Sequence, residues 1–432
     1  MLDIIQFIEE KGGNPEQIRK SQAARGDSVE LVDEIINGYK EWTKIRFDLD
    51  ALNKEQNKVQ KAIGAKFKAK EDASELIKEK DAIAAKKAEL TIKEQEADQA
   101  VRNKVNLVGN IVHESVVVSN DEENNEIVRK WNPEGKEVDE TKKAALSHHE
   151  VLTRLDGYDP ERGTKISGHR GYFLRNWGVF LNQAMINYGL DFLAKREYIP
   201  LQAPVMMNKE VMAKTAQLSQ FDEELYKVID GNDEKYLIAT SEQPISAYHS
   251  GEWFEQPAEQ LPKRYAGYST CFRREAGSYG AHVRGLNRLH QFDKVEIVQV
   301  SHPNNSYKAL EEMVSHVEEI VISLELPYRI LRLCGGDMGF TSALTYDFEV
   351  FSAAQQRWLE VSSVSNFESF QANRLKLRYR DEEGKIEIAH TLNGSALALP
   401  RIVAAILENN QQEDKIRVPK VLVPYTRFEY IE

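Results

Sequence analysis

The stretch Cys271-Phe272-Arg273-Arg274-Glu275 decides the fold of this chain, together with Arg284-Gly285-Leu286-Asn287-Arg288-Leu289-His290-Gln291-Phe292, which follows a turn-rich connection. If residues 272–275 form a strand, the alternation of side chains places Arg273 and Glu275 on one face. Arg273 then offers a planar set of donors, and Glu275 beside it offers an acceptor. Such a pair can hold a phosphate oxygen and a ring amino group together.

A second arginine stands far downstream, at the end of a segment of small residues, His390-Thr391-Leu392-Asn393-Gly394-Ser395-Ala396-Leu397-Ala398-Leu399-Pro400-Arg401. Two arginines on ordered backbone, with an aromatic residue such as Phe292 nearby, are what an ATP-activating site without a Walker loop requires. The pattern therefore predicts a nucleotide site assembled from distant segments.

The composition is typical of a globular protein with a charge-rich helical part: 432 residues, 41% apolar and 29% charged. This length accommodates two or three domains. No apolar run is long enough to cross a membrane, and the N-terminal segment lacks a signal pattern, so we expect a cytoplasmic protein with no membrane partner. The two cysteines, Cys271 and Cys334, are too few for a disulfide framework and are expected to be buried thiols.

Residues 29–108 contain no proline and show the heptad rhythm of a coiled coil. One series of large or mostly apolar residues recurs three and four apart, at Trp42, Ile45, Leu49, Leu52, Gln56, Val59 and Ile63. A second series steps by seven, at Leu76, Ile83, Leu90 and Ala97. Residues 64–70 interrupt the rhythm, and Asp72 precedes Glu75 by three positions, as at a helix start. We predict two long antiparallel helices that form an arm.

The predicted end of this arm is rich in lysine, with Glu55 as the only acid in the same stretch. The lysines are Lys54, Lys58, Lys61, Lys66, Lys68 and Lys70. Most lysine-rich helices are only solvated surfaces, and a net charge of −12 excludes nucleic-acid binding over the whole surface. Clustering at one end nevertheless favours contact with a phosphate backbone.

A polar connector at residues 116–150 precedes a mixed α+β region over 151–432. Helices are predicted over 178–195, 306–324 and 401–409, and strands over 198–207, 295–300, 328–333 and 347–351. Pro200 and Pro204 interrupt the first of these strands.

Taken together, the chain resembles the seryl-tRNA synthetases, a family of class II aminoacyl-tRNA synthetases, over essentially its whole length. Three stretches are similar, in order, to the class II signature motifs: the helix and strand ending at Ala203-Pro204-Val205, residues 272–275 with 284–292, and residues 393–401. The seryl assignment rests on residues 239–244, 290–292 and 360–363, similar to the family's amino-acid loop, adenine-stacking segment and metal-binding strand. Residues 1–277 are similar to fungal members and 278–432 to bacterial ones, as in a chimeric or designed chain.

The resemblance implies an α+β fold, in which a class II antiparallel β-sheet is flanked by helices and an antiparallel coiled-coil arm lies at the N-terminus. It implies a tRNA-binding helical domain over 1–115, a connector over 116–150 and a catalytic domain over 151–432. It also implies a homodimer whose arm binds tRNA(Ser) through the six lysines. Motif 1 of the family commonly has a glycine before its aromatic residue, whereas Glu197 precedes Tyr198 here, which affects the predicted dimer contact.

The activity implied is that of a serine–tRNA ligase, which forms seryl-adenylate from serine and ATP and then passes the seryl group to tRNA. Such chemistry needs positioning and electrostatic stabilisation and no enzyme nucleophile. The resemblance makes Arg273, Glu275 and Arg401 catalytic. Arg273 would bind the α-phosphate and the serine carboxylate, and Glu275 the adenine amino group. Phe292 and Arg401 would cover the two faces of adenine. Arg401 would also reach the γ-phosphate, and Arg288 would steady the outer phosphates.

The remaining implied site residues are oxygen-bearing side chains. Glu360 and Ser363, three residues apart, suit Mg²⁺ shared with the phosphates. Thr240 and Glu296 would bind the serine ammonium and hydroxyl groups. The other residues of the serine pocket would be Glu242, Arg273, Asn393 and Ser395. Glu296 could instead be a structural acid paired with Lys294.

Three alternatives stay open at this point. One is a class II synthetase for another small amino acid, such as threonine. Another is a non-catalytic, RNA-binding synthetase paralogue, and the third is a plain coiled-coil interaction protein. The histidines His148, His149, His249 and His290 lack metal-ligand spacing, so they are expected to be surface or internally satisfied residues, and no catalytic zinc is expected.

Overall fold

The computed structural model describes residues 1–216, 224–275 and 284–432. The turn-rich connection predicted between Glu275 and Arg284 lies outside the described residues. Contacts within the chain divide it into two units, Met1–Ile111 and Val112–Glu432. Among the helices described in either unit, none has the length and apolarity of a membrane span.

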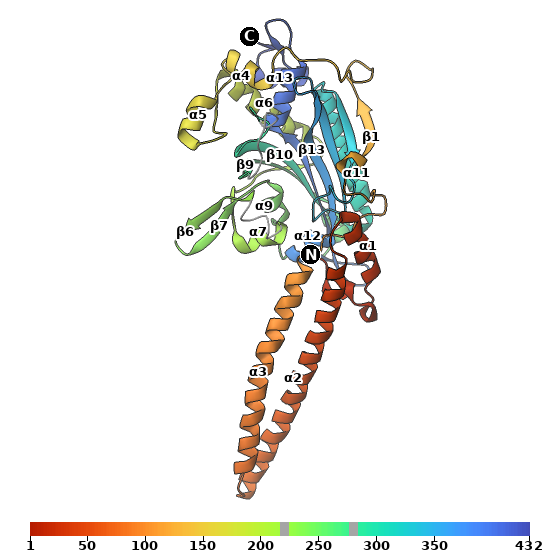
Figure 1. Cartoon of the computed structure of the whole chain (residues 1–432), viewed down its shortest axis with the longest axis vertical. Coiled ribbons are helices and arrows are strands. Elements are labelled where there is room, and N and C mark those ends of the chain that lie inside the picture. Colours follow the sequence, from red (N-terminus) through yellow and green to blue (C-terminus); the bar gives the residue numbers. More distant parts are fainter. Residues whose placement is uncertain (217–223, 276–283) are drawn as a thin grey trace. The chain divides into compact units, whose positions relative to one another are not determined.

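The first unit contains the predicted helical hairpin (Figure 1). Its helices are α1 (Pro15–Arg25), α2 (Glu30–Ala69) and α3 (Ser74–Val105). The seam between α2 and α3 is made by apolar side chains from both predicted heptad series, including Leu52, Val59, Ile63, Leu76 and Ile83. The predicted antiparallel arm is therefore confirmed.

The turn of the hairpin lies later than the sequence suggested. α2 continues through Gly64 and ends at Ala69, because Lys70 adopts a left-handed conformation with φ 57°. Asp72 then accepts a hydrogen bond from the Ser74 amide at 3.0 Å and so helps to start α3. A glycine inside a helix costs only about 1 kcal/mol relative to alanine, which is too little to break a helix stabilised by a long seam.

The second unit is built on an eight-stranded sheet with the order β1-β11-β12-β13-β16-β10-β9-β4. All neighbouring strands are antiparallel except β4 and β9. The strands are β1 (Glu126–Trp131), β4 (Ile199–Gln202), β9 (Lys263–Phe272), β10 (Gln291–Ser301), β11 (Tyr328–Arg332), β12 (Leu344–Ser352), β13 (Arg357–Glu368) and β16 (His390–Ala398). This arrangement is the predicted class II antiparallel core.

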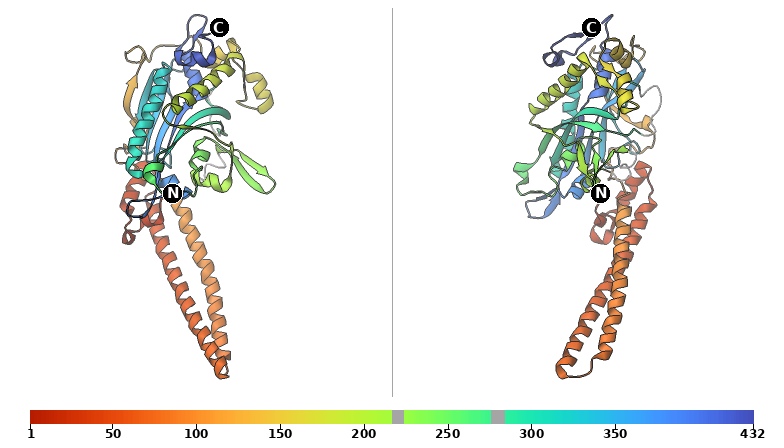
Figure 2. Two further views of the ribbon diagram at one scale, coloured as in Figure 1. Left: turned by 180° about the vertical axis from the view of Figure 1, so that it is seen from behind. Right: turned by 90° about the vertical axis from the view of Figure 1, so that its left-hand side faces the viewer.

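Three helices share one hydrophobic core with this sheet: α6 (Asn176–Ala194), α11 (Ser306–Ser323) and α13 (Leu399–Asn409). Their apolar side chains meet Val295 and Ile297 of β10 and Val364 of β13. Figure 2 shows α11 lying along the strands. Because side chains alternate along a strand, Glu296, between Val295 and Ile297, faces the other side of the sheet.

Shorter elements surround this core. The helices are α4 (His148–Arg154), α5 (Pro160–Ser167), α7 (Lys209–Thr215), α9 (Glu242–Ser246), α10 (Pro257–Gln260), α12 (Ser369–Leu375) and α14 (Val423–Thr426). The small sheets contain β2 (Tyr158–Asp159) with β3 (Phe173–Leu174), β5 (Met206–Asn208) with β6 (Lys227–Asp230) and β7 (Asp233–Leu237), β8 (Trp253–Phe254) with β14 (Arg378–Arg380) and β15 (Ile386–Ile388), and β17 (Ile416–Arg417) with β18 (Tyr430–Ile431).

The segment predicted as a polar connector contributes β1, which pairs with β11 at one edge of the sheet. Five of the six β1 side chains are exposed, so the strand carries no alternation of buried and exposed residues. Without that alternation, the sequence offers no signal for a strand.

The motif 1 strand is interrupted at Pro204 as predicted, but not at Pro200. β4 ends at Gln202 and β5 begins at Met206, on either side of Pro204. Pro200 lies within β4, where it is tolerated because β4 is the last strand of the sheet.

Glu197 is the non-glycine residue before the motif 1 aromatic, and its backbone is left-handed with φ 65°. A glycine favours this conformation, whereas a residue with a Cβ is strained by roughly 1 kcal/mol or more. The Glu197 side chain is largely exposed, and its ion pair with Arg264 contributes little. The next residue, Tyr198, is 2% exposed and accepts a hydrogen bond from Gln299 at 2.9 Å. The packing and hydrogen bond of Tyr198 thus offset the backbone strain at Glu197.

Replacing Glu197 with glycine is expected to raise the free energy of unfolding by about 1 kcal/mol, since glycine relieves the left-handed strain. Urea unfolding of the two proteins measures the difference. The matched control is Lys195→Gly, at the C-terminal end of α6, where φ is −66° and not left-handed. That change should destabilise by about 0.5–1 kcal/mol. Equal effects of the two substitutions would contradict the explanation.

Candidate active site

The two strands that carry the motif 2 residues are paired in register. Phe272 of β9 lies opposite Gln291 of β10, and Cys271 lies opposite Phe292. Just beyond β9, the Arg273 amide donates to the His290 carbonyl at 3.0 Å, so the pairing continues past the strand end. The Arg273 guanidinium lies 5.3 Å from the centre of the Phe292 ring. These contacts fix the arginine next to the aromatic residue predicted to stack on adenine.

A cavity of about 130 Å³ opens at this point. It is lined by Arg273, Glu275, Leu286, Asn287, Arg288, Leu289, Phe292, Lys294, Glu360, Val361, Ser362, Ser395, Ala398, Pro400 and Arg401. A second cavity of about 550 Å³ shares Asn287, Arg288, Glu360 and Arg401 with the first. The first cavity alone is smaller than the roughly 300–1,000 Å³ usual for ligand sites, but the two adjoining cavities together reach that size.

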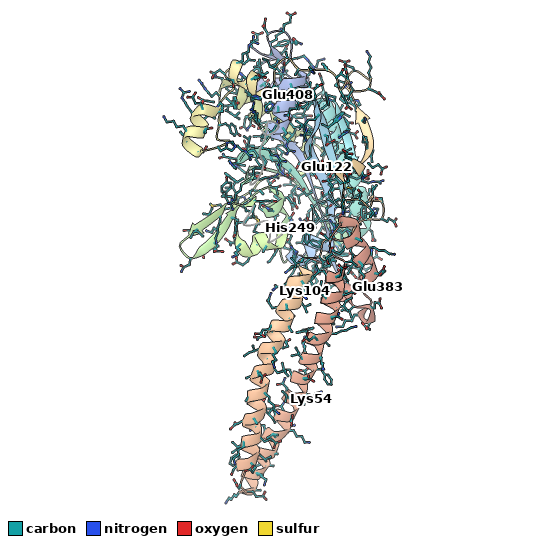
Figure 3. All side chains as sticks on the ribbon, in the orientation of Figure 1. Lys54, Lys104, Glu122, His249, Glu383 and Glu408 are labelled. Carbon is teal, nitrogen blue, oxygen red and sulfur yellow. The ribbon has the colours of Figure 1, made fainter. Side chains whose placement is uncertain are left out.

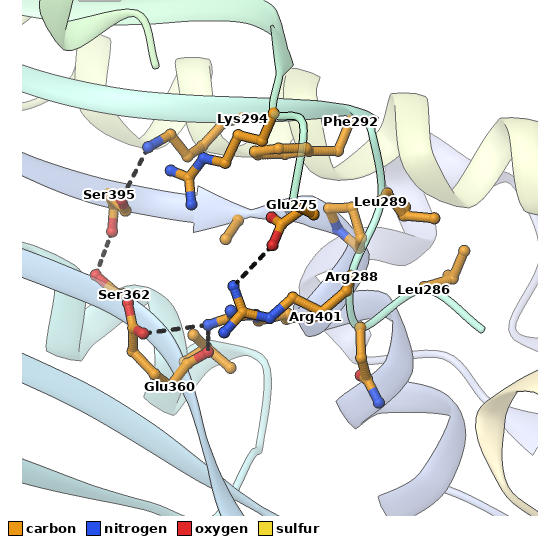
Figure 4. A pocket seen from close by; sticks show the side chains of 15 residues that line it. Glu275, Leu286, Arg288, Leu289, Phe292, Lys294, Glu360, Ser362, Ser395 and Arg401 are labelled. Carbon is orange, nitrogen blue, oxygen red and sulfur yellow. Dashed lines mark hydrogen bonds and ion pairs between the residues drawn. The ribbon is translucent and has the colours of Figure 1, made fainter. Parts of the chain in front are cut away.

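The charged side chains of the cavity pair with one another (Figure 4). Arg288 lies 3.3 Å from Glu275, and Arg401 lies 3.3 Å from a carboxylate oxygen of Glu360. Arg401 also donates to the Glu360 carbonyl. Both pairs are partly exposed, so their net stabilisation is small and a polyanionic ligand can replace them at little cost. The site thus contains bidentate donors suited to phosphate, with acceptors beside them.

A smaller polar pocket is centred on Glu296, which is fully buried on β10. Its carboxylate accepts hydrogen bonds from Thr240 at 3.2 Å and from Ser395 at 3.1 Å, and also from the Asn393 amide. Lys294 forms an ion pair with the same carboxylate. The two interpretations of Glu296 are therefore both visible: it contacts the predicted serine-pocket residues, and it pairs with Lys294.

Glu242 lies at the start of α9, beside this pocket, and accepts a hydrogen bond from Gln371 at 2.6 Å. Burial, together with the negative charge of Glu296, raises the pKa of Glu242 to about 7. Two carboxylates in one pocket are typical of a site that accommodates a cationic group.

The raised pKa of Glu242 predicts a pH effect on stability. Between about pH 4.5 and 7 the folded protein holds a proton that the unfolded chain has lost, so this group makes the free energy of unfolding fall as pH rises through that window. Replacing Glu242 with glutamine should remove this contribution. Unfolding both proteins in urea at pH 5, 6 and 7 compares them; parallel pH profiles would contradict the assignment.

The two predicted metal ligands are placed differently. Glu360 lines both cavities, whereas Ser363 is in the wall of neither. Ser363 lies opposite Asp347 in the β12–β13 pairing. Burial, and then the charge of Glu360, raise the pKa of Asp347. Within the described ranges, no group of three or more His, Cys, Asp or Glu side chains is arranged to hold a metal ion.

Lys294 is a cavity residue that the sequence suggested only as a partner of Glu296. It lies two residues after Phe292 and two before Glu296 on β10, and its ammonium lies 3.4 Å from the Ser395 hydroxyl. The period of two along a strand would have placed all three side chains on one face. Asn287 and Ser362 also line the cavity, and no comparable signal marks them in the sequence.

The arm carries the predicted lysines on and after α2. Five are exposed, and Lys66 is half-buried and pairs with Glu71 at 3.4 Å. Lys54 extends from α2 (Figure 3). Acids that follow α2 are added to the same tip, among them Asp72 in the turn and Glu75 in the first turn of α3. The basic surface is therefore narrower than the α2 sequence alone suggested, and Phe67, 62% exposed, lies within it.

Comparison with known proteins agrees with both units. The family model "Seryl-tRNA synthetase N-terminal domain" matches residues 1–112, and "tRNA synthetase class II core domain (G, H, P, S and T)" matches residues 226–410. The cytoplasmic serine–tRNA ligases of Saccharomyces cerevisiae and Candida albicans are 59% and 58% identical, each over 98% of this chain and 94% of the relative. These alignments run through residues 278–432 as well.

A solved structure gives the same result. The seryl-tRNA synthetase of Pyrococcus horikoshii complexed with ATP is 34% identical and superposes with a TM-score of 0.89, over 100% of this chain and 99% of that one. Identity at this level over the full length exceeds what a shared fold alone would produce. The chain therefore belongs to the seryl-tRNA synthetase family of class II aminoacyl-tRNA synthetases, whose activity is serine–tRNA ligation.

Proposed function

We propose that this chain activates serine with ATP in the cavity around Arg273 and then transfers the seryl group to tRNA(Ser). The proposal rests on one observation: residues from distant segments of the chain converge on a single cavity. Arg273, Glu275 and Phe292 from motif 2 share one cavity with Arg401 from motif 3, and the Glu296 pocket adjoins it. A non-catalytic paralogue has no need to keep these groups together.

In the first step a carboxylate oxygen of serine attacks the α-phosphorus of ATP, and the bond from that phosphorus to the bridging oxygen breaks, releasing pyrophosphate. Negative charge grows on the phosphoryl oxygens, where the Arg273 guanidinium can donate two hydrogen bonds. Arg288 and Arg401 would leave Glu275 and Glu360 to bind the outer phosphates. Glu275, once freed, would accept from the adenine amino group.

In the second step a terminal ribose hydroxyl of tRNA attacks the carbonyl carbon of the adenylate. AMP leaves with the electron pair of the broken bond, and its phosphate can take up the hydroxyl proton. Neither step needs a nucleophile from the enzyme, because the two substrates supply the attacking oxygens. The contribution of the chain is to hold the reactants in line, which can supply a large part of the rate enhancement.

Magnesium fits the oxygen donors beside the cavity. Among the described residues, one buried carboxylate oxygen of Asp347 has no hydrogen-bond partner, and Glu360 and Ser363 lie close to this carboxylate. Glu360 and Ser363 would hold the ion jointly with the phosphates, and Asp347 would support Ser363. When bound, Mg²⁺ neutralises charge on the phosphates.

Serine selectivity would come from hydrogen bonds in the Glu296 pocket. Thr240, Asn393 and Ser395 already point polar atoms at the Glu296 carboxylate. A substrate with a small hydroxyl and an ammonium group can replace these contacts, whereas an alanine-like rival leaves buried polar atoms unpaired. Glu242 would add a second acceptor for the ammonium group.

We also propose the assembly that the family implies. The motif 1 elements expose apolar side chains in succession: Val179 and Phe180 on α6, and Ile199 on β4. Phe180 is 61% exposed, which is unusual for a residue of a core helix and suits a partner subunit. The proposal therefore includes a homodimer through motif 1 and a cytoplasmic location. Residues 1–115 would bind tRNA(Ser), residues 116–150 would form a connector, and residues 151–432 would form the catalytic domain.

Serine-dependent exchange of labelled pyrophosphate into ATP tests the activity directly. Serine should support exchange at least about 10²-fold better than threonine or alanine, because their side chains leave the pocket's polar groups unpaired or crowded. Better exchange with threonine would replace the proposal with a threonine enzyme. No exchange with any amino acid would favour the non-catalytic paralogue.

A further inference from the structure

His148 is the first residue of α4, and it lies outside the motifs from which the site was predicted. Its side chain is 2% exposed and its partner Glu408 is 1% exposed. The imidazole Nδ1 lies 2.6 Å from a Glu408 carboxylate oxygen, and the Leu286 amide donates to Nε2 at 3.0 Å. The His148 amide also donates to the same Glu408 oxygen at 3.2 Å. One buried ring therefore joins two segments far apart in sequence.

These partners determine which nitrogen carries the proton. A backbone amide can only donate, so Nε2 must present its lone pair to Leu286. Nδ1 then carries the hydrogen and donates it to Glu408. Although burial opposes it, hydrogen bonds from His148 and Ser352 lower the pKa of Glu408, which keeps this acceptor charged. Both ring nitrogens are thus used, and neither is free for proton transfer to a substrate.

The two joined segments both lead into the cavity. Leu286 is followed by Asn287 and Arg288, and all three line it. Glu408 lies on α13, seven residues after Arg401, which is about two turns of the same helix. Figure 3 labels Glu408 on this helix. The His148 ring therefore connects the backbone beside Arg288 to α13, the helix that carries Arg401.

The local backbone is shaped around this contact. Gly285 has φ 65°, and a Cβ added there would lie 2.3 Å from the His148 Nε2 atom. Only glycine allows the Leu286 amide to approach the ring so closely. Ser352 of β12 donates to the second oxygen of Glu408, so the carboxylate is held from both sides.

We propose that His148 is a positioning residue for ATP: by joining the Leu286 backbone to Glu408, it holds Arg288 and Arg401 at the spacing that the nucleotide requires. The proposal rests on the proposed function, since it assumes that these arginines bind ATP. Positioning groups of this kind act through preorganisation of the residues that touch the ligand. A purely structural histidine would instead affect folding stability and leave nucleotide affinity unchanged.

The test compares His148→Phe, which fills the space without an acceptor, with His148→Gln, which keeps one donor and one acceptor. H148F should raise the KM for ATP in pyrophosphate exchange about tenfold, whereas H148Q should stay within about threefold of wild type. His149→Phe is the matched control, because the His149 ring contacts Ser147 at 3.0 Å and should leave the KM for ATP unchanged. An unchanged KM for ATP in H148F, or an equal rise in H149F, overturns the proposal.

Amide hydrogen exchange provides a readout that needs no substrate. In H148F the peptide over residues 284–292 should exchange faster than in wild type, while the peptides of the arm stay unchanged. Glu408→Gln is a second variant in case H148F does not fold. It replaces the charged acceptor of the His148 Nδ1 hydrogen with a neutral one and should also speed amide hydrogen exchange at Leu286. No change at Leu286 overturns the proposal. If the wild type fails to activate serine but these differences in amide hydrogen exchange appear, the proposed function is wrong, while the link that His148 makes between Leu286 and Glu408 is confirmed.

Discussion

Replacing Arg273 with alanine is expected to reduce serine-dependent pyrophosphate exchange by about 10³-fold, because the substitution removes a bidentate donor from the point where phosphoryl charge develops. The residue is held for this role: its amide donates to His290, and its guanidinium lies beside Phe292 and donates to the Ala239 carbonyl at 3.3 Å. Exchange kinetics with saturating ATP and serine measure the loss. Binding of tRNA(Ser) should persist, since the proposed tRNA-binding lysines lie on the arm.

Arg274→Ala is the matched control, because the Arg274 side chain is exposed and does not line the cavity that contains Arg273 and Glu275. Exchange by R274A should remain within about threefold of wild type, as for most surface substitutions. Equal losses for R273A and R274A would mean that the segment matters only for folding, and the assignment of Arg273 would be wrong.

Replacing residues 48–90 with a short glycine-rich turn should have the opposite effect. We expect pyrophosphate exchange to stay near the wild-type rate and serine transfer to tRNA(Ser) to fall by at least about 10³-fold, since several of the lysines proposed to bind phosphates would be removed together. The cut leaves the base of the hairpin intact, because Trp42 donates to Glu94 at 2.8 Å beyond it. Loss of exchange together with charging would contradict separate roles for the two units.

Point substitutions then locate the tRNA-binding surface on the arm. Alanine at Lys54, Lys58 and Lys61 should weaken tRNA binding and lower the slope of log K against log salt by about 0.7–0.9 for each phosphate that is no longer neutralised. Lys93→Ala is the control, because Lys93 pairs with Glu89 at 2.7 Å on the same arm. If the control changes the salt slope as much as the lysines near the tip do, general charge and not a defined surface explains binding.

The arm could be predicted because its signal is local: heptad spacing alone placed Val59 opposite the series of Ile83. Arg273 and Glu275 do line one cavity, but the strand expected over 272–275 is wrong. β9 ends at Phe272 and Glu275 has φ 48°, so strand alternation is not what brings the two side chains together.

The prediction of a basic tip was less accurate, because residues from another segment also lie there. The acids that narrow the basic surface, among them Asp72 and Glu75, follow the turn, so the α2 sequence could not show them.

Other features had no local signal. β1 has no alternation, because nearly all its side chains are exposed at the sheet edge. His148 was expected to be a surface or satisfied histidine, and the second description holds, but its partner Glu408 lies 260 residues away. Spacing rules describe one helix or strand at a time, and they do not show which distant carboxylate a buried ring will meet.

The most direct test of the account is a crystal structure with a non-hydrolysable seryl-adenylate analogue that carries a sulfamoyl linkage. The adenine ring should lie between Phe292 and Arg401, the sulfamoyl group should contact Arg273, and the seryl ammonium should approach Glu296 and Thr240. Glu275 should accept a hydrogen bond from the adenine amino group. An analogue bound elsewhere, or one whose adenine lies away from Phe292 and Glu275, would contradict the proposed site.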